Sequence, residues 1–151
     1  MYSNELLDLS NELIKTGLKR FGLSLGIVSH IDYDEYEVIA VITDPRVFGL
    51  NDFSVGDKFP LKDTYCLEVY RDRKTVALTE MAGEIGLKKH PLYTPGFIET
   101  VISSPIIVND KVWGTINFSC KKFRNTSYTD NDVIYIKLAS LLILMVTFST
   151  F

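Results

Sequence analysis

The segment at 97–132 constrains the fold more strongly than any other part of the chain. Two apolar stretches flank Asn109-Asp110, and a polar loop then leads to the sequence Thr129-Asp-Asn-Asp132. A two-residue link of this kind between β-forming stretches is typical of a tight hairpin turn. Thr129 with an acidic residue three positions later is typical of a capping box at the start of a helix. We therefore predict a β-hairpin at 97–119 and a helix at 130–148.

The rest of the chain adds shorter elements around this hairpin. Residues 3–20 have a helical period with one apolar stripe. We further predict strands at 23–31 and 36–43, a loop at 44–61, a short helix from Asp63 or Thr64 to Arg73, a strand at 75–79 and a loop at 80–96. Strands and helices in this order predict an α+β fold, with an antiparallel sheet and the first and last helices packed together on one face.

Length, charge and cysteine content limit the class of protein. A chain of 151 residues with 46% apolar residues is expected to form one domain over 1–151. The net charge of −3 gives no electrostatic basis for nucleic-acid binding. Cys66 and Cys120 lack metal-binding spacing, and no signal peptide is evident, so we expect free thiols and a cytoplasmic location. The apolar tail at 138–151 is shorter than the ~20 residues that a membrane span needs.

The last helix is apolar on nearly all sides. One stripe comprises Ile134, Leu138, Leu141, Leu142 and Met145, and a second face comprises Ile143, Leu144, Val146 and Phe148. A helix with this pattern requires cover on more than one side. We therefore expect a homodimer that pairs through the helices at 3–20 and 130–148.

Five short segments carry a family resemblance. They are Asp63-Thr-Tyr-Cys66, Thr75-Val-Ala-Leu-Thr79, Ser104-Pro-Ile-Ile-Val-Asn109, Val112-Trp-Gly-Thr-Ile-Asn-Phe118 and Tyr128-Thr-Asp-Asn-Asp132. In this order and spacing the chain resembles the GAF domain, the ligand-sensing module of cyclic-nucleotide phosphodiesterases, phytochromes and many bacterial signalling proteins, and is most similar to the bacterial signalling form. The resemblance implies an antiparallel sheet of five or six strands, with a pocket between the sheet and the segments at 62–73 and 80–96.

The strand at 112–119 suggests which side chains face that pocket. Alternate side chains of a strand point to opposite faces. Val112, Gly114, Ile116 and Phe118 suit a helix-packed face, which leaves Trp113, Thr115, Asn117 and Ser119 for the other face. The candidate ligand-binding residues are Tyr65, Cys66, Tyr70, Met81, Tyr93, Phe97, Trp113, Thr115 and Asn117. Ordinary core packing is the alternative for each of the aromatic residues.

Cys66 and the two histidines suggest more specific functions. Cys66 near a helix start would be a redox or nitrosylation sensor if its pKa were lowered. It could also attach a bilin, but the family members that do so place a His beside the Cys, whereas Leu67 and Glu68 follow here. An inert, partly buried thiol is the favoured interpretation. His30 and His90 are potential haem ligands, but both are expected to be surface residues.

Three function hypotheses remain from the sequence. The first is a cytoplasmic sensory domain without catalysis, which binds an unidentified small ligand or a signalling partner and transmits the signal through its terminal helices to a separate effector protein. The second is a dimerisation or docking module with an empty pocket. The third is a redox enzyme similar to free-methionine sulfoxide reductase, against which the segment at 98–104 lacks cysteine. The residue set of cyclic-GMP-binding members is not present in the family's arrangement, and the sequence names no cofactor.

Overall fold

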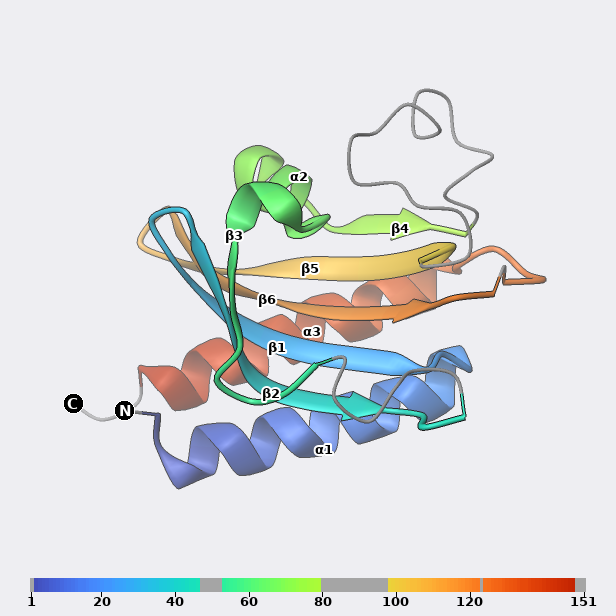
Figure 1. The fold of residues 1–151 in the computed structure, drawn as a ribbon, viewed down its shortest axis with the longest axis horizontal. Coiled ribbons are helices and arrows are strands. Elements are labelled where there is room, and N and C mark those ends of the chain that lie inside the picture. Colours follow the sequence, from blue (N-terminus) through green and yellow to red (C-terminus); the bar gives the residue numbers. More distant parts are fainter. Residues whose placement is uncertain (1, 47–52, 80–97, 123, 149–151) are drawn as a thin grey trace.

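A computed structural model describes residues 2–46, 53–79, 98–122 and 124–148. In this part of the chain one antiparallel sheet has the strand order β3-β2-β1-β6-β5-β4 (Figure 1). The elements are α1 (Asn4–Phe21), β1 (Leu25–Asp32), β2 (Glu35–Thr43), β3 (Lys58–Pro60), α2 (Cys66–Asp72), β4 (Val76–Leu78), β5 (Thr100–Val108), β6 (Lys111–Cys120) and α3 (Asp130–Thr147). The predicted α+β fold is confirmed.

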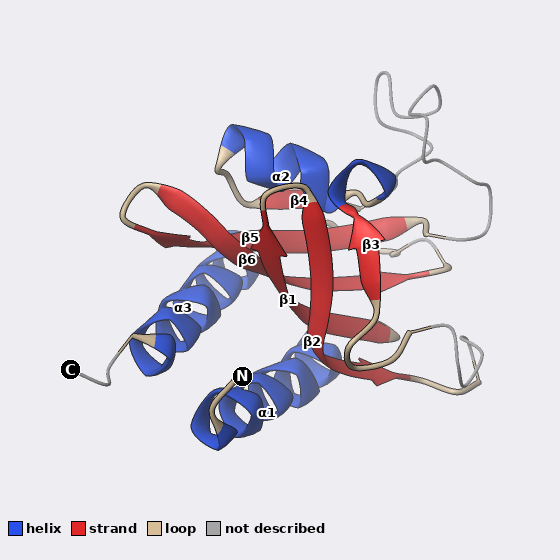
Figure 2. Ribbon diagram, turned by 60° about the vertical axis from the view of Figure 1, so that its left-hand side comes forward, coloured by secondary structure: helices blue, strands red, loops and turns tan. Residues whose placement is uncertain are grey.

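The helices divide between the two faces of the sheet. Figure 2 shows α1 and α3 side by side on one face and α2 on the other. Contact between the terminal helices includes a hydrogen bond from the Tyr135 hydroxyl to the Leu13 carbonyl at 3.1 Å. The prediction that the first and last helices pack together on one face is therefore confirmed.

Local signals fix the turn of the long hairpin and the helix ends. Asn109 and Asp110 both have positive φ, 49° and 65°, which a tight two-residue turn with the twist of the flanking strands requires. At the start of α3, the Thr129 amide donates to Asp132 Oδ2 at 2.9 Å, and the Asp132 amide donates to Thr129 Oγ1 at 3.1 Å. The predicted hairpin and capping box are both confirmed.

The main core lies between the sheet and the two terminal helices. Phe118 and Ile116 of β6 are completely buried there, together with Ile14 of α1 and Ile136 of α3. The Phe118 ring packs edge-on against Phe21, with 5.1 Å between the ring centroids. This layer accounts for the apolar stripe of α1 and one face of α3.

The outer stripe of α3 remains uncovered in the single chain. Its members are exposed by 44–64%: Ile134, Leu138, Leu141, Leu142 and Met145. The described part of α1 exposes no large apolar side chain. If the two helices form an interface between copies, α3 supplies its apolar part.

Two short elements differ from the predictions. The predicted loop at 44–61 contains β3, which pairs with β2 and places Phe59 opposite Tyr36. The helix α2 is preceded by a 3₁₀ turn at Leu61–Asp63, and its N-cap is Tyr65, which makes no side-chain cap. The Thr64 hydroxyl instead donates to the Leu61 carbonyl at 2.9 Å, so the predicted capping by Asp63 or Thr64 is wrong.

A β-bulge changes the face assignment at one end of β6. Ile107 pairs with Val112, but Ile106 pairs with Gly114, so Trp113 is an extra residue. An extra residue shifts the alternation of side chains by one position. Val112 consequently lies with the apolar residues on the α2 side, whereas Trp113 packs against the core on the α1 and α3 side. The predicted faces of these two residues are wrong, while those of Thr115, Ile116, Asn117 and Phe118 are correct.

Candidate ligand-binding site

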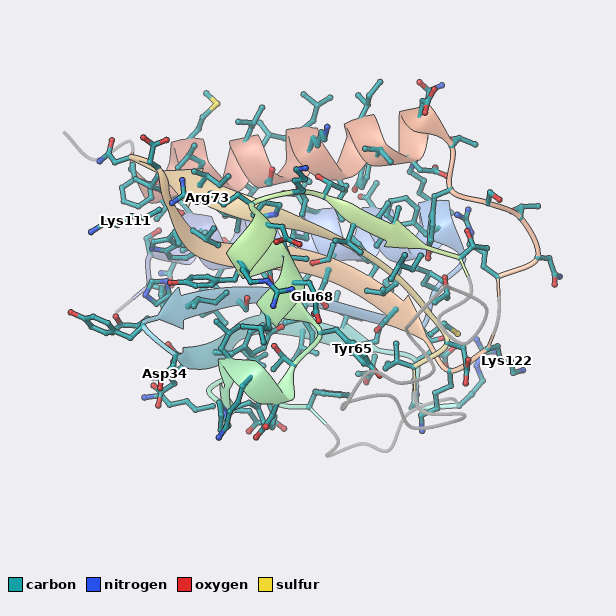
Figure 3. All side chains as sticks on the ribbon, turned by 90° about the horizontal axis from the view of Figure 1, so that it is seen from above. Asp34, Tyr65, Glu68, Arg73, Lys111 and Lys122 are labelled. Atoms are coloured by element: carbon teal, nitrogen blue, oxygen red, sulfur yellow. The ribbon has the colours of Figure 1, made fainter. Side chains whose placement is uncertain are left out.

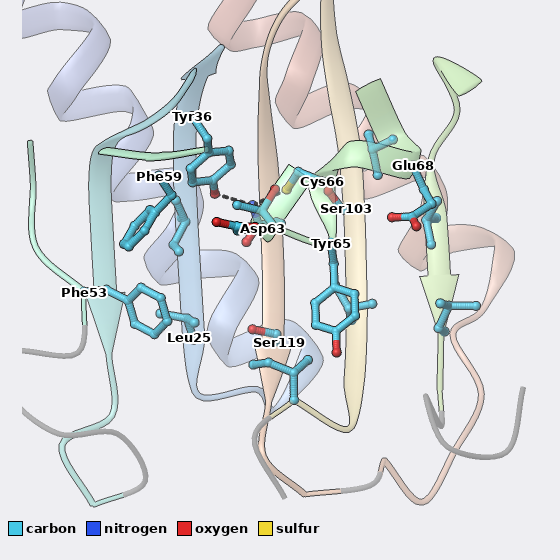
Figure 4. A pocket seen from close by; sticks show the side chains of 18 of the residues that line it. Leu25, Tyr36, Phe53, Phe59, Asp63, Tyr65, Cys66, Glu68, Ser103 and Ser119 are labelled. Carbon is cyan, nitrogen blue, oxygen red and sulfur yellow. Dashed lines mark hydrogen bonds between the residues drawn. The ribbon is translucent and has the colours of Figure 1, made fainter. Parts of the chain in front are cut away.

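A cavity of about 540 Å³ lies between α2 and the open face of the sheet (Figure 4). This volume falls within the range of about 300–1,000 Å³ that is usual for small-molecule sites. Most of its wall is apolar, with Leu25, Ile27, Phe53, Phe59, Val69, Val76, Leu78, Ile98 and Val101 among the lining residues. The cavity lies between the sheet and the segment at 62–73, as the resemblance implied, while the segment at 80–96 lies outside the described residues.

The cavity forms between the sheet and α2, which packs over β5 and β6. The 3₁₀ turn buries Leu61, and the first turn of α2 buries Cys66 and Val69 against the strands. Figure 3 looks down on this face, with Tyr65 and Glu68 labelled on and beside α2. Short side chains, Ser103 on β5 and Ser119 on β6, stand on the sheet within the cavity lining. They leave space that larger side chains would fill.

A polar network forms the floor of the cavity. Asn117 Nδ2 donates to the Tyr36 hydroxyl at 3.1 Å and lies 3.5 Å from Cys66 Sγ. Thr115 Oγ1 lies 3.5 Å from the same sulfur and 2.7 Å from Ser29 Oγ. These groups join β1, β2, β6 and α2 in one buried cluster, and a satisfied cluster of this kind fixes the orientation of its members.

The ionisable members of the network are neutral at pH 7. Burial raises the pKa of the Cys66 thiol, although hydrogen bonds with Thr115, Tyr36 and Ser103 act in the opposite direction. Burial and the neighbouring Cys66 raise the pKa of Tyr36 well above its ordinary value. The hypothesis that the helix start lowers the pKa of Cys66 is therefore wrong, and the favoured interpretation as an inert thiol agrees with the structure. Both Cys66 and Cys120 are free and buried.

One hydroxyl in the cavity wall has no hydrogen bond to an oxygen or nitrogen atom of the described residues. Ser103 is only 2% exposed, and among these residues its Oγ interacts with the Cys66 thiol alone. Buried hydroxyl groups are nearly always hydrogen-bonded, because an unpaired one loses its interaction with water without replacement. A thiol is a weak hydrogen-bonding group, so the Ser103 hydroxyl can also bind a ligand atom or a water molecule.

The charges along the described cavity lining are all negative. Asp63, Glu68 and Asp72 contribute to the lining, and no Lys, Arg or His does so among the residues that the structure describes. Asp63 and Asp72 are solvent-exposed, and Asp72 also lies 3.5 Å from Arg71. The acidic groups therefore belong to α2 and the turn before it, whereas the floor is polar and uncharged.

The structure brings only part of the predicted residue set into the cavity. Tyr65, Cys66 and Asn117 line it, and Thr115 lies in the network beneath it. Tyr70 packs at the edge of the apolar cluster on this side but is not among the lining residues. Met81, Tyr93 and Phe97 lie outside the described residues. The sequence analysis missed several lining residues, of which Tyr36, Phe53 and Ser103 are the most informative.

Trp113 lies in an aromatic cluster away from the cavity. Its ring centroid lies 4.4 Å from that of His30. The centroids of Tyr2 and Phe148 are farther away, at 6.3 and 6.4 Å. His30 Nδ1 donates to the Trp113 carbonyl at 2.7 Å, and His30 is partly exposed at the surface and packs one side of its ring in this cluster. His90 lies outside the described residues. The cluster joins the start of α1 to the residue that follows α3.

Solved structures that are similar to this chain include GAF domains and photoreceptor domains. The GAF domain of an Acinetobacter phosphoenolpyruvate-protein phosphotransferase matches with a TM-score of 0.73 at 16% identity, over 94% of this chain and 81% of that one. The PixJ GAF domain of Thermosynechococcus elongatus, in its blue-light absorbing form, matches with a TM-score of 0.64 at 17% identity, over 96% and 88% of the two chains. This chain has a GAF fold.

A phytochrome domain has the same fold, whereas family models and curated proteins give no match. The chromophore-binding domain of a Stigmatella aurantiaca bacteriophytochrome has a TM-score of 0.70 at 16% identity, over 95% of this chain. The GAF-fold chain spans 54% of that larger domain. A scan against models of protein families and a search of curated proteins find no match. At identities this low, structural similarity establishes the fold only. The function has to be argued from the site.

Two further properties of the GAF-fold chain bear on the predictions. Among the described residues, no helix is both long enough and apolar enough to cross a membrane. The same residues contain no group of three or more His, Cys, Asp or Glu side chains that could hold a metal ion.

Proposed function

We propose that this GAF-fold chain is a sensory or regulatory domain that binds a small molecule in the cavity beneath α2. The observation that carries the proposal is a largely apolar cavity of about 540 Å³ whose wall includes the buried hydroxyl of Ser103, which has only the Cys66 thiol beside it as a partner among the described residues. Small-molecule sites usually combine apolar walls with a few polar groups that orient the ligand. Two of the structures with this fold are described as a chromophore-binding domain and as a blue-light absorbing form, which supports the same class of function.

The strands provide a mechanical connection from the cavity to the terminal helices. On β6, Asn117 faces the cavity, whereas its neighbours Ile116 and Phe118 are buried in the core that α1 and α3 cover. A ligand that favours one position of β6 would therefore also favour one packing of the two helices. A ligand shifts such an equilibrium only by the difference between its affinities for the two arrangements.

We propose no catalytic step for this site. The Cys66 thiol is protonated at neutral pH because burial raises its pKa, and its hydrogen-bond partners include the Thr115 hydroxyl and the Asn117 amide. A sensory role requires that the signal pass to another protein, so we also propose a separate effector protein as a partner. A single domain over 1–151 and a cytoplasmic location remain predictions from the sequence.

A docking module without a ligand is the second candidate function. It is favoured by the exposed apolar stripe of α3, because contiguous apolar surface on a soluble chain marks an interaction site. The two candidates are compatible if the stripe pairs two copies while the cavity binds a ligand. They differ in whether the cavity ever takes up a small molecule.

The experiment is a thermal-shift screen combined with native mass spectrometry of the protein as purified. The screen covers nucleotides, amino acids, organic acids, aromatic amines and amides, and tetrapyrroles. A ligand that binds only the folded state stabilises it by about 2.7 kcal/mol at a hundredfold excess over its dissociation constant. The result that supports the proposal is a stabilising compound, or a co-purified molecule, that is lost in Ser119→Leu. In this variant the larger side chain fills cavity space, since Ser119 lines the cavity.

The matched control is Lys111→Leu. Lys111 is an exposed residue at the start of the same strand, and it does not line the cavity. This variant should keep the ligand response of the wild type. A protein that carries no small molecule and responds to no compound class would leave the docking module as the better account.

A further inference from the structure

We propose that the molecule has a second binding site, which takes the carboxylate or phosphate group of a small molecule that also carries an apolar chain or ring. The site is a groove of about 520 Å³ between α3, β5 and the segment that joins α2 to β4, called the edge groove below. This volume is usual for a small-molecule site. The inference goes beyond the proposed function, because the edge groove shares none of its described lining residues with the cavity beneath α2.

The two sites lie on opposite faces of the sheet. Ser103 of β5 lines the cavity, whereas its neighbour Ser104 lines the edge groove. Successive side chains of a strand point to opposite faces, and α3 packs on β5 on the face that α2 does not cover. A ligand in one site therefore does not compete for space with a ligand in the other.

The end of α2 brings basic residues to this groove. Arg73 has a positive φ of 54°, and its amide donates to the Val69 carbonyl at 2.9 Å, which ends α2 as a left-handed cap. The chain then turns into β4, which pairs with β5. Figure 3 labels Arg73 at the end of α2 that lies nearer to α3. Arg73 and Lys74 consequently line the groove from one side, and Lys137 lines it from α3.

The charges of the groove are positive and unpaired within the described part of the chain. Arg73, Lys74 and Lys137 are exposed, and none of them forms an ion pair with a described residue. No acidic side chain is among the described lining residues. Asp72, which precedes Arg73, lies outside the lining and 3.5 Å from Arg71. One exposed cation attracts an anion only weakly, but several cations around one concave surface raise the local concentration of anions.

A pair of hydroxyl groups in the groove wall adds a directed donor. Thr75 Oγ1 and Ser104 Oγ lie 3.0 Å apart, and among the described residues this is the only hydrogen bond of either side chain. Two hydroxyl groups carry two hydrogen atoms, and only one of these lies between the two oxygens, so the other can be donated to a ligand. A carboxylate or phosphate oxygen accepts such a bond, and bonds to a charged acceptor are stronger than bonds between neutral groups.

The rest of the groove wall is apolar. Pro105 and Ile107 of β5 and Leu141 and Leu144 of α3 line it beside the charged groups, and Leu141 is 52% exposed. An inorganic ion would leave this surface in contact with water. A chain or ring attached to the anionic group would cover it, and removal of apolar surface from water adds to the affinity. The combination therefore fits an anion with an apolar body better than a free ion.

The test compares four compounds that share a hexyl chain: heptanoate and hexyl phosphate as anions, hexan-1-ol as the neutral member and hexylamine as the cation. An equivalent phenylpropyl set covers a ligand with a ring, and inorganic phosphate is the anionic group without a body. Chemical shifts of methyl-labelled protein at pH 7 give the dissociation constants and the location. We expect the anions of at least one set to bind about fivefold more tightly than its alcohol and amine, and to shift the methyl groups of Ile107, Leu141 and Leu144. Inorganic phosphate should bind at least about threefold more weakly than the phosphate with a body.

Two double substitutions separate the charges from the hydroxyl pair. Lys74→Gln combined with Lys137→Gln should weaken the anions by about fivefold and leave the alcohol unchanged. Thr75→Val combined with Ser104→Ala removes both hydroxyl groups and should weaken the anions by about three- to tenfold. An increase in sodium chloride from about 50 to about 500 mM should weaken the wild type several-fold, because exposed charges are screened.

The controls come from the same structure. Lys15 and Lys19 are exposed on α1 and do not line the groove, so Lys15→Gln combined with Lys19→Gln removes the same net charge and should keep the wild-type affinity within about twofold. Ser119→Leu fills space in the cavity and should leave the affinity of the groove unchanged. Far-UV circular dichroism shows that each variant is folded.

The outcomes test this inference separately from the proposed function. An alcohol that binds as tightly as the anions, or an anion affinity that Lys74→Gln with Lys137→Gln leaves unchanged, would overturn the anion site. Inorganic phosphate that binds as tightly as the phosphate with a body would overturn the role of the apolar wall. Shifts of the cavity methyl groups of Leu78 and Val101 in place of the groove methyl groups would overturn the location and support the proposed function instead. Failure of every anion to bind would overturn this inference and leave the proposed function unaffected.

Discussion

The ring of Phe118 occupies the space that a side chain at Gly17 would need. A Cβ built on Gly17 would lie 2.5 Å from Phe118 Cε1, well inside van der Waals contact. Phe118 is fully buried, and its ring also packs against Phe21. A glycine inside α1, near its C-terminal end, lowers helix propensity but allows the helix to approach the sheet closely at Phe118.

Gly17→Ala should destabilise the protein in spite of the better helix propensity of alanine. The propensity gain is about 1 kcal/mol, whereas overpacking of a core costs about 1–3 kcal/mol. The obstructing atoms belong to a fully buried ring, so we expect a net loss of roughly 1 kcal/mol in urea melts. Addition of Phe118→Leu should relieve the clash, so that Gly17→Ala costs less in this background. Equal costs in both backgrounds would contradict the packing described here.

Phe118→Ala and Trp113→Ala should differ clearly in cost. Phe118 lies in the main core, and its truncation should cost ~3–5 kcal/mol as a cavity change. Trp113 is half-buried at the end of the sheet, so its loss should cost less and mainly loosen the packing of Tyr2 and Phe148. Denaturant melts followed by far-UV circular dichroism measure both variants. A larger loss for Trp113→Ala would show that the aromatic cluster, and not the helix layer, dominates stability.

The stability of the start of α3 should depend on pH through Asp132. Burial alone would raise the pKa of Asp132, but the hydrogen bonds with Thr129 and the charges of Arg124 and Arg20 outweigh it and lower the pKa. A group with a lowered folded-state pKa stabilises the fold above its unfolded pKa of about 3.9 and loses this contribution as the pH falls through the folded value. Asp132→Asn should therefore cost roughly 1 kcal/mol at pH 7 and progressively less below about pH 4.

Asp130→Asn is the control for this prediction. Asp130 is an exposed residue in the same helical turn, so its replacement should change stability by only a few tenths of a kcal/mol at either pH. Urea melts at pH 7 and pH 3 provide both comparisons. A cost of Asp132→Asn that does not change with pH would show that the carboxylate charge contributes nothing.

The exposed stripe of α3 should pair two copies of the chain. Leu138 and Leu141 are 55% and 52% exposed, so a charged substitution there leaves the core of one chain intact. We expect a dimer for the wild type at tens of micromolar in sedimentation velocity, and a folded monomer for Leu141→Glu. Tyr33→Glu, at an apolar residue that is 87% exposed in the β1–β2 turn, should remain dimeric. A monomeric wild type would contradict the predicted homodimer.

Much of the fold was predictable because its signals are local. The positive φ angles at Asn109 and Asp110 and the capping box of Thr129 and Asp132 depend on neighbouring residues only. β3 was missed because three residues carry too little periodicity, and its pairing with β2 is a tertiary contact. A local sequence signal cannot report such a contact.

The cavity was predictable only in outline. Tyr65, Cys66 and Asn117 were placed correctly, but Trp113 was not, because the alternation along β6 shows no interruption in the sequence. Gly114 was the available hint, since a glycine inside a strand often marks a bulge. Ser103 and Tyr36 were missed because their inward orientation depends on the register of β5 and β2, which pairing across the sheet determines.

The central claim, that the cavity beneath α2 binds a small molecule, is tested most directly by NMR contacts between a bound probe and methyl groups. The probe is the compound that stabilises the protein most in the thermal-shift screen, at saturation with methyl-labelled protein. We predict nuclear Overhauser effects from this compound to the methyl groups of Leu78, Ile98 and Val101, which line the cavity. Effects confined to the exposed methyl groups of Leu138 and Leu141 on α3, or absent altogether, would contradict the account.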